Sequence, residues 1–165
     1  MKIAGKKIEG LNTVRILIGR PDGNIEFIAQ GIPSYEEFNK VCPAPNPPKR
    51  TYPDGRIEEN RADPKFKEAA AEWANRKGHW TILKSLSATK DLVWETVDME
   101  NPETWEKYLK ELQEAGLSEV EITKVINGIM TANGLNQVMI DEAEKRFLAG
   151  RGQEQAEDRS PSIEP

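Results

Sequence analysis

The first forty residues carry hydrophobic runs typical of short β-strands. Two of these runs, residues 13–18 and 25–29, flank the sequence Arg20-Pro21-Asp22-Gly23-Asn24. This sequence predicts a hairpin turn, because proline presets φ and Gly23 accepts a positive φ that other residues resist. Residues 2–4 and 7–9 predict a second short hairpin, so we expect a small antiparallel β meander.

A short helix and a proline-rich segment follow. Ser34 is placed to cap the helix, with Glu37 as its capping-box partner, and the helix is expected to lie on the sheet. From residue 43 to residue 62, repeated prolines exclude a helix, and the apolar content is too low for a core strand. We expect an extended connector with one turn. It acts either as a stiff spacer, which we favour, or as a proline motif for SH3-like grooves.

Helical spacing of the hydrophobic residues begins at Asp63. Asp63-Pro64 is a typical helix start, and the apolar stripe from Phe66 to Leu83 predicts a long helix that ends near Leu86. Residues 87–97 contain apolar side chains without a period that assigns them to a helix or a strand. Three further helices have clear start and stop signals and predict a compact bundle; they span residues 101–116, 118–134 and 136–149, and Ser118 with Glu121 predicts a capping box at the start of the second.

The pattern as a whole predicts an α+β protein with an N-terminal antiparallel β meander, a proline-rich connector and a mainly helical C-terminal bundle. After residue 150 the composition is too polar to offset the entropy of ordering the backbone, which predicts a disordered tail. The expected divisions are a β unit with a short helix (1–42), the connector (43–62), a helical domain (63–149) and the tail (150–165).

Composition narrows the classes of function. The chain of 165 residues has 37% hydrophobic and 31% charged residues, and it has no apolar run long enough to span a membrane or to form the centre of a signal peptide. Cys42 and His79 are the only cysteine and the only histidine, which excludes an internal disulfide and a zinc site built from Cys and His, and we expect a reducing cytosol. The net charge of −5 disfavours general nucleic-acid binding.

The residue types needed for catalysis do not form a recognisable pattern. A dyad of Cys42 and His79 requires the fold to bring them together, and a small buried cysteine and a histidine on a helix flank are the simpler interpretation. The carboxylates sit in contexts typical of solvated helix faces and caps, and no glycine-rich loop follows a strand. We therefore predict a protein that is not an enzyme and needs no cofactor or metal.

Basic and aromatic residues are the remaining candidates for a binding surface. Lys49, Arg50 and Tyr52 could contact a nucleic-acid strand, although acidic residues nearly balance the basic ones in the first sixty residues, so a solvated rim is favoured. The four tryptophans are expected to share one core, with an exposed aromatic patch as the alternative.

Several segments, in their order along the chain, resemble small proteins encoded in the tail-morphogenesis region of tailed bacteriophages, and the named family they most resemble is the tail assembly chaperone. The resemblance is strongest from Trp94 to Pro165, whereas the β unit and the connector depart from the mostly helical pattern of that family. The segments are Val41-Cys42-Pro43-Ala44-Pro45-Asn46-Pro47-Pro48, Ala62-Asp63-Pro64-Lys65-Phe66, Asn101-Pro102-Glu103-Thr104-Trp105 and Ala143-Glu144-Lys145-Arg146-Phe147-Leu148-Ala149-Gly150.

The resemblance implies a non-enzymatic protein that coats the tape measure protein through helical surfaces, keeps it soluble and helps to recruit tail tube subunits, in the cytoplasm of the infected bacterial host. It also implies a longer form made by ribosomal frameshifting in some members. A homo-oligomer is expected. The candidate residues for the partner-binding groove, or else for the core, are Ile122, Ile126, Met130, Met139, Phe147 and Leu148.

Two alternatives belong to other classes of function. The first is a structural virion component, such as a tail or head-tail connector subunit, in which the β unit and the connector pack between subunits. The second is a small nucleic-acid-binding regulator that uses Lys49, Arg50 and Tyr52.

Overall fold

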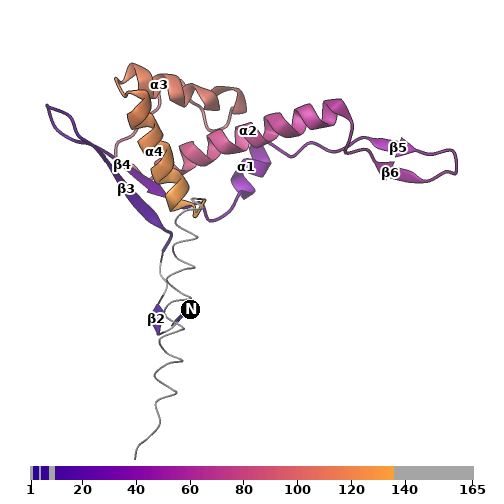
Figure 1. The fold of residues 1–165 in the computed structure, drawn as a ribbon, viewed down its shortest axis with the longest axis horizontal. Coiled ribbons are helices and arrows are strands. Elements are labelled where there is room, and N and C mark those ends of the chain that lie inside the picture. Colours follow the sequence, from indigo (N-terminus) through magenta and orange to yellow (C-terminus); the bar gives the residue numbers. More distant parts are fainter. Residues whose placement is uncertain (1, 4, 8–9, 136–165) are drawn as a thin grey trace, which may run out of the picture.

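The computed structural model describes residues 2–3, 5–7 and 10–135, and its elements confirm the α+β class (Figure 1). Strands dominate the N-terminal part and helices the remainder. In chain order the elements are β1 (Lys2–Ile3), β2 (Lys6–Lys7), β3 (Thr13–Ile18), β4 (Ile25–Gln30), α1 (Glu36–Val41), β5 (Lys49–Thr51), β6 (Ile57–Glu59), α2 (Pro64–Leu86), the 3₁₀ helix η1 (Pro102–Lys107), α3 (Tyr108–Glu114) and α4 (Glu119–Ala132).

The strands form three separate antiparallel hairpins instead of the expected meander. The turn between β3 and β4 is as predicted: the Gly23 N–H donates to the Arg20 carbonyl at 3.2 Å, and Gly23 has a φ of 128°. However, β1 and β2 have only two residues each and pair with each other, not with β3. Strands of two residues have few backbone N–H and C=O groups with which to pair with a further strand. The prediction of one continuous meander was therefore wrong, because β1–β2 and β3–β4 form separate sheets.

The proline-rich segment also differs from the prediction, because it contains a hairpin. Strands β5 and β6 pair around a turn in which the Gly55 N–H donates to the Tyr52 carbonyl at 2.9 Å. All six strand residues are exposed. The low apolar content of this segment excluded a buried core strand, but it does not exclude an exposed hairpin. Figure 1 shows the hairpin extending from the N-terminal end of α2, away from the other elements.

Helix α1 lacks the capping box that the sequence predicted. The helix begins at Glu36, and its N-cap residue, Tyr35, makes no side-chain capping bond. The Ser34 hydroxyl accepts from the Glu36 N–H at 3.3 Å, but the Glu37 carboxylate accepts instead from the Lys84 ammonium at 2.6 Å. A salt bridge to α2 therefore replaces the local cap.

The long helix agrees with the sequence prediction, whereas the single helix predicted over 101–116 is divided into the 3₁₀ helix η1 and α3. The Asp63 carboxylate accepts from the Phe66 N–H at 3.0 Å, and α2 ends at Leu86. Only its C-terminal part is buried in the core, while residues near Phe66 are half-buried or exposed. Gly116 ends α3 with a φ of 85°. The predicted helix over 136–149 and the predicted disordered tail lie outside the described residues.

The β unit and the helices share one hydrophobic core. Helix α4 packs across β3 and β4, and α2 contacts β4 and α4. The alternation of the hairpin turns Ile16 and Phe27 into this core and leaves Leu17 exposed. Trp80 and Trp105 are buried in the core, and Trp73 and Trp94 are half-buried against it, so the tryptophans belong to one core as predicted.

Candidate functional site

Helix α4 directs its predicted binding residues mostly toward the protein interior. Ile122 is only 5% exposed and belongs to the hydrophobic core, and Ile126 packs against that core. Met130 is half-buried. The other three candidates, Met139, Phe147 and Leu148, lie outside the described residues. Ile122 is therefore a core residue, and the apolar stripe of α4 supports the β3–β4 hairpin.

Two neighbouring cavities offer a more accessible surface. Both are lined in part by the loop over residues 87–97, the segment that the sequence pattern assigned to neither a helix nor a strand. We call the first the acidic pocket: it measures about 520 Å³ and lies between the start of β4, the loop and the C-terminal end of α3. Apolar side chains line it together with five carboxylates and a single lysine. Its lining residues are Ile25, Glu26, Phe27, Thr89, Lys90, Asp91, Leu92, Val93, Trp94, Glu95, Glu111, Leu112, Glu114, Ala115 and Leu117.

Side-chain hydrogen bonds hold the loop at both ends of the acidic pocket. The Thr89 hydroxyl accepts from the Ile28 N–H at 2.9 Å and lies 3.1 Å from the Ile28 carbonyl, to which it donates. At the other end, the Glu111 carboxylate accepts from the N–H groups of Glu95 and Thr96 at 2.9 and 2.7 Å. The loop is thus fixed to β4 and α3, although it has no regular secondary structure.

The charged form of Glu111 stabilises the hydrogen bonds that hold the loop on α3. Burial by itself would raise the pKa of Glu111, but hydrogen bonds from the Thr96 hydroxyl and from the backbone N–H groups of Glu95, Thr96 and Val97 outweigh it and lower the pKa. The carboxylate therefore remains charged at neutral pH and keeps accepting these bonds.

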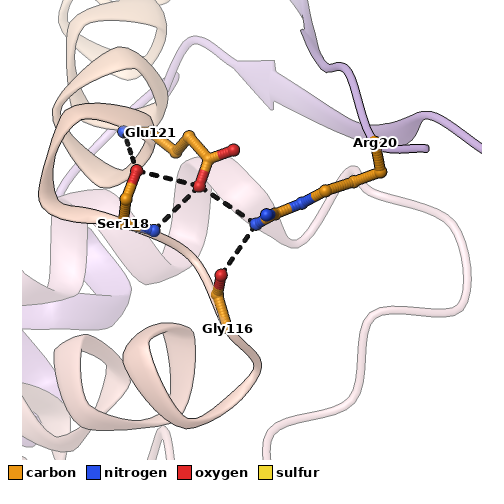
Figure 2. Close-up of polar contacts among 4 residues, drawn as sticks. All are labelled: Arg20, Gly116, Ser118 and Glu121. Carbon is orange, nitrogen blue, oxygen red and sulfur yellow. Dashed lines mark hydrogen bonds and ion pairs between the residues drawn. The ribbon is translucent and has the colours of Figure 1, made fainter. Parts of the chain in front are cut away.

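Arg20 fixes the corner between α3 and α4 (Figure 2). Two residues of this corner, Ala115 and Leu117, line the acidic pocket. The Arg20 guanidinium donates to the Gly116 carbonyl at 2.8 Å and to the Glu121 carboxylate at 3.0 Å. Glu121 also accepts from the Ser118 N–H at 2.8 Å and completes the capping box of α4. The β3–β4 turn, the α3–α4 corner and the start of α4 are thereby joined.

The contact between Arg20 and Glu121 is expected to make the stability of the fold depend on pH. Hydrogen bonds from Ser118 and the charge of Arg20 lower the pKa of Glu121, so its contribution to stability is present above the unfolded-state pKa and is lost as the pH falls through the folded-state pKa. We expect Glu121→Gln to lower the melting temperature near pH 7, and the difference from the unmodified protein to shrink in acid below the usual glutamate range. Melting curves from pH 7 to pH 3 measure this.

Glu119→Gln is the matched control, because Glu119 is exposed in the same first turn of α4. It removes the same charge without removing the Arg20 contact. Equal effects of the two substitutions at every pH would show that the Arg20 contact contributes no stability.

The second cavity, which we call the tryptophan pocket, adjoins the acidic pocket. It measures about 380 Å³ and shares Leu92 and Trp94 with its neighbour. Apolar side chains dominate its lining, and Glu37, Glu100 and Lys84 supply the charges. The remaining lining residues are Val41, Trp80, Leu83, Ser87 and Met99.

The residues considered for catalysis have structural contacts. Cys42 is buried at the end of α1, where its carbonyl accepts from the Trp73 indole N–H at 3.0 Å. His79 is half-buried on α2, and its ring centre lies 5.7 Å from that of Tyr108.

Within the described residues, no group of three or more His, Cys, Asp or Glu side chains could hold a metal ion. No described helix combines the length and the hydrophobicity needed to cross a bilayer.

The basic residues considered for nucleic-acid binding lie on the β5–β6 hairpin. The Arg50 and Arg56 guanidinium groups lie 5.2 and 5.3 Å from the centre of the Tyr52 ring. The register places Lys49 opposite Glu59 and Arg50 opposite Glu58. The hairpin therefore carries both signs of charge, which weakens attraction to a phosphate backbone.

Sequence reasoning missed both pockets because their lining comes from segments distant in the chain. The available signal was local: Leu92, Val93 and Trp94 are apolar residues in a segment without helical or strand periodicity. Such residues must be covered by other elements or form a surface.

Comparisons of the chain with protein-family models, with curated proteins and with solved structures found no match.

Proposed function

We propose that this protein is a non-enzymatic tail assembly chaperone that binds helical segments of a phage tape measure protein and keeps them soluble. Two features support the proposal: the resemblance of the segments from Trp94 onward to that family, and the tryptophan pocket. The pocket is the observation that carries it, since an apolar cavity at the surface accepts the hydrophobic side chains of an amphipathic helix.

The charges around the pocket suit such a partner. At the tryptophan pocket Glu37 is paired with Lys84, so Glu100 supplies the acidic charge there, and the acidic pocket adjoins it. Basic residues beside the apolar stripe of a partner helix would be attracted to this surface, which speeds encounter and fixes orientation. Tail tube subunits are the second partner that the family resemblance suggests.

Met99 gives the sharpest test of the proposal. It lines the tryptophan pocket and is half-buried, so Met99→Lys places a charge where the partner's apolar side chain would sit. We expect the affinity for the tape measure protein to fall by about tenfold, equivalent to about 1.4 kcal/mol of binding, and the soluble tape measure protein recovered on coexpression to fall with it. The yield of the soluble complex after affinity capture measures it.

Met130→Lys is the matched control, because Met130 is also half-buried but lies on α4 outside both pockets. Near-normal recovery with this variant supports the pocket. If Met130→Lys abolishes recovery while Met99→Lys does not, the α4 surface predicted from the sequence binds the partner instead. A tape measure protein that is equally insoluble with and without the unmodified chain would overturn the chaperone function.

The β5–β6 hairpin favours one alternative, a structural virion component. An exposed hairpin that extends from the body can reach a neighbouring subunit (Figure 1). Recovery of this chain in stoichiometric amounts from purified particles would support that function over the chaperone.

A further inference from the structure

The β5–β6 hairpin and the residues that follow it form an arm, residues 49–61, whose charges are incompletely paired. Each of the three arm carboxylates has a partner within the arm: Arg56 pairs with Asp54 and Glu58, and Arg61 pairs with Glu59. Lys49 and Arg50 are in none of the ion pairs found among the described residues. The arm therefore presents two basic side chains for a contact outside itself.

The arm also exposes apolar surface. Ile57 is 63% exposed, and the Tyr52 ring is half-buried between the Arg50 and Arg56 guanidinium groups. A two-stranded hairpin with three-residue strands has little stability of its own in water, so a partner that covers it would stabilise it.

The acidic pocket has the complementary properties. Its floor is apolar, with Phe27, Leu92 and Leu112 among its lining residues. Three of its five carboxylates are in ion pairs, with Arg15, Lys90 and Lys110, and the other two, Glu95 and Glu111, leave the pocket with a negative charge. Two of these carboxylates, Glu95 and Glu114, belong to exposed residues that a docking chain could reach, and the ion pair of Glu114 with Lys110 is itself exposed and 3.5 Å long.

The arm of one molecule cannot fill the pocket of the same molecule. The arm lies just before the N-terminal end of α2, and the loop that lines the pocket lies just after its C-terminal end (Figure 1). With its 23 residues, α2 separates them by about 35 Å.

We propose that the arm of one molecule docks into the acidic pocket of a second copy, with Lys49 and Arg50 facing Glu95 and Glu114 and with Ile57 and Tyr52 covering the apolar floor. The contact joins two different surfaces, so two copies that exchange arms reciprocally form a closed dimer, and copies that do not exchange them form a larger ring or an open chain. It does not depend on the tape measure protein being the partner of the tryptophan pocket.

Reciprocal charge reversal tests the proposal with the full-length chain. Lys49→Glu with Arg50→Glu makes the arm acidic, and Glu95→Lys with Glu114→Lys makes the pocket basic. We expect the unmodified protein to associate with increasing concentration in sedimentation experiments, and more weakly at high salt. Each double variant should associate about tenfold or more weakly by itself.

An equimolar mixture of the two double variants should restore association, because the acidic arm then meets a basic pocket and the basic arm meets an acidic one. Lys65→Glu with Lys67→Glu, two reversals on the exposed face of α2, should leave association unchanged. An unmodified protein that stays monomeric at every concentration would overturn the proposal. So would variants that associate normally, or folded variants whose mixture does not associate. Since none of these variants changes Met99, these outcomes are separate from the chaperone test.

Discussion

Replacing Phe38 with alanine is expected to lower the free energy of unfolding by about 3–5 kcal/mol, the usual cost of deleting a buried aromatic ring. Phe38 is fully buried, with an exposed fraction of 0%. Its ring centre lies 5.5–5.9 Å from those of Trp73, Trp80 and Trp105. The substitution therefore leaves a cavity where α1, α2 and η1 meet. Urea unfolding, monitored by tryptophan fluorescence, measures the loss.

Phe66→Ala is the matched control for this prediction. Phe66 is half-buried in the first turns of α2, so removing its ring should cost only about 1 kcal/mol. Because whole domains are stable by about 5–15 kcal/mol, the Phe38 variant should lose a large fraction of the total stability, whereas the Phe66 variant should lose a small one. Similar losses for the two variants would contradict the packing of α1 against the tryptophans.

Gly128→Ala is expected to destabilise the protein by about 1–3 kcal/mol, although alanine is the better helix former. Gly128 lies in α4 where the helix crosses β3, and an added Cβ would lie 2.5 Å from Ile16 Cγ1. Ile16 is buried, so its side chain has little room to move. The hairpin and α4 would have to separate slightly, and the melting temperature should fall by several degrees.

Gly78→Ala provides a control of opposite sign. Gly78 lies within α2, and an added Cβ would have no neighbouring atom within 4 Å. Without a clash, only the helix preference remains, and the variant should be more stable by about 0.5–1 kcal/mol. Destabilisation by both alanines, or by neither, would show that the close approach of α4 to β3 does not decide the outcome.

The different environments of Gly128 and Gly78 could not be predicted from the sequence, whereas the capping of several helices could. Both lie in helical segments of the sequence, and nothing local distinguishes them. Capping signals such as Asp63 and the pair Ser118 and Glu121 were interpreted correctly, because a cap is made within a few residues of chain. The capping box at Ser34 was wrong because Glu37 finds a cation on another helix, Lys84.

The candidate site was less predictable than the fold. Ile122 was chosen from its place on an apolar stripe, but a stripe does not tell a core face from a binding face. The acidic pocket needs Phe27 from β4, Trp94 from the loop and Leu112 from α3. The exposed β5–β6 hairpin was missed for the opposite reason, since its strands lack the apolar residues that signal burial.

The sequence alone determined the local features of this protein: the α+β class, the turn at Gly23, the beginning and end of α2, and the capping of α4. These depend on backbone dihedrals and hydrogen bonds between near neighbours. Only the tertiary structure decided that the β3–β4 hairpin and the helices share one core, that the arm extends from it, and that an unassigned loop lines two pockets. Those features depend on contacts between distant residues, whose geometry is fixed by packing and not by the order of residues in any one segment.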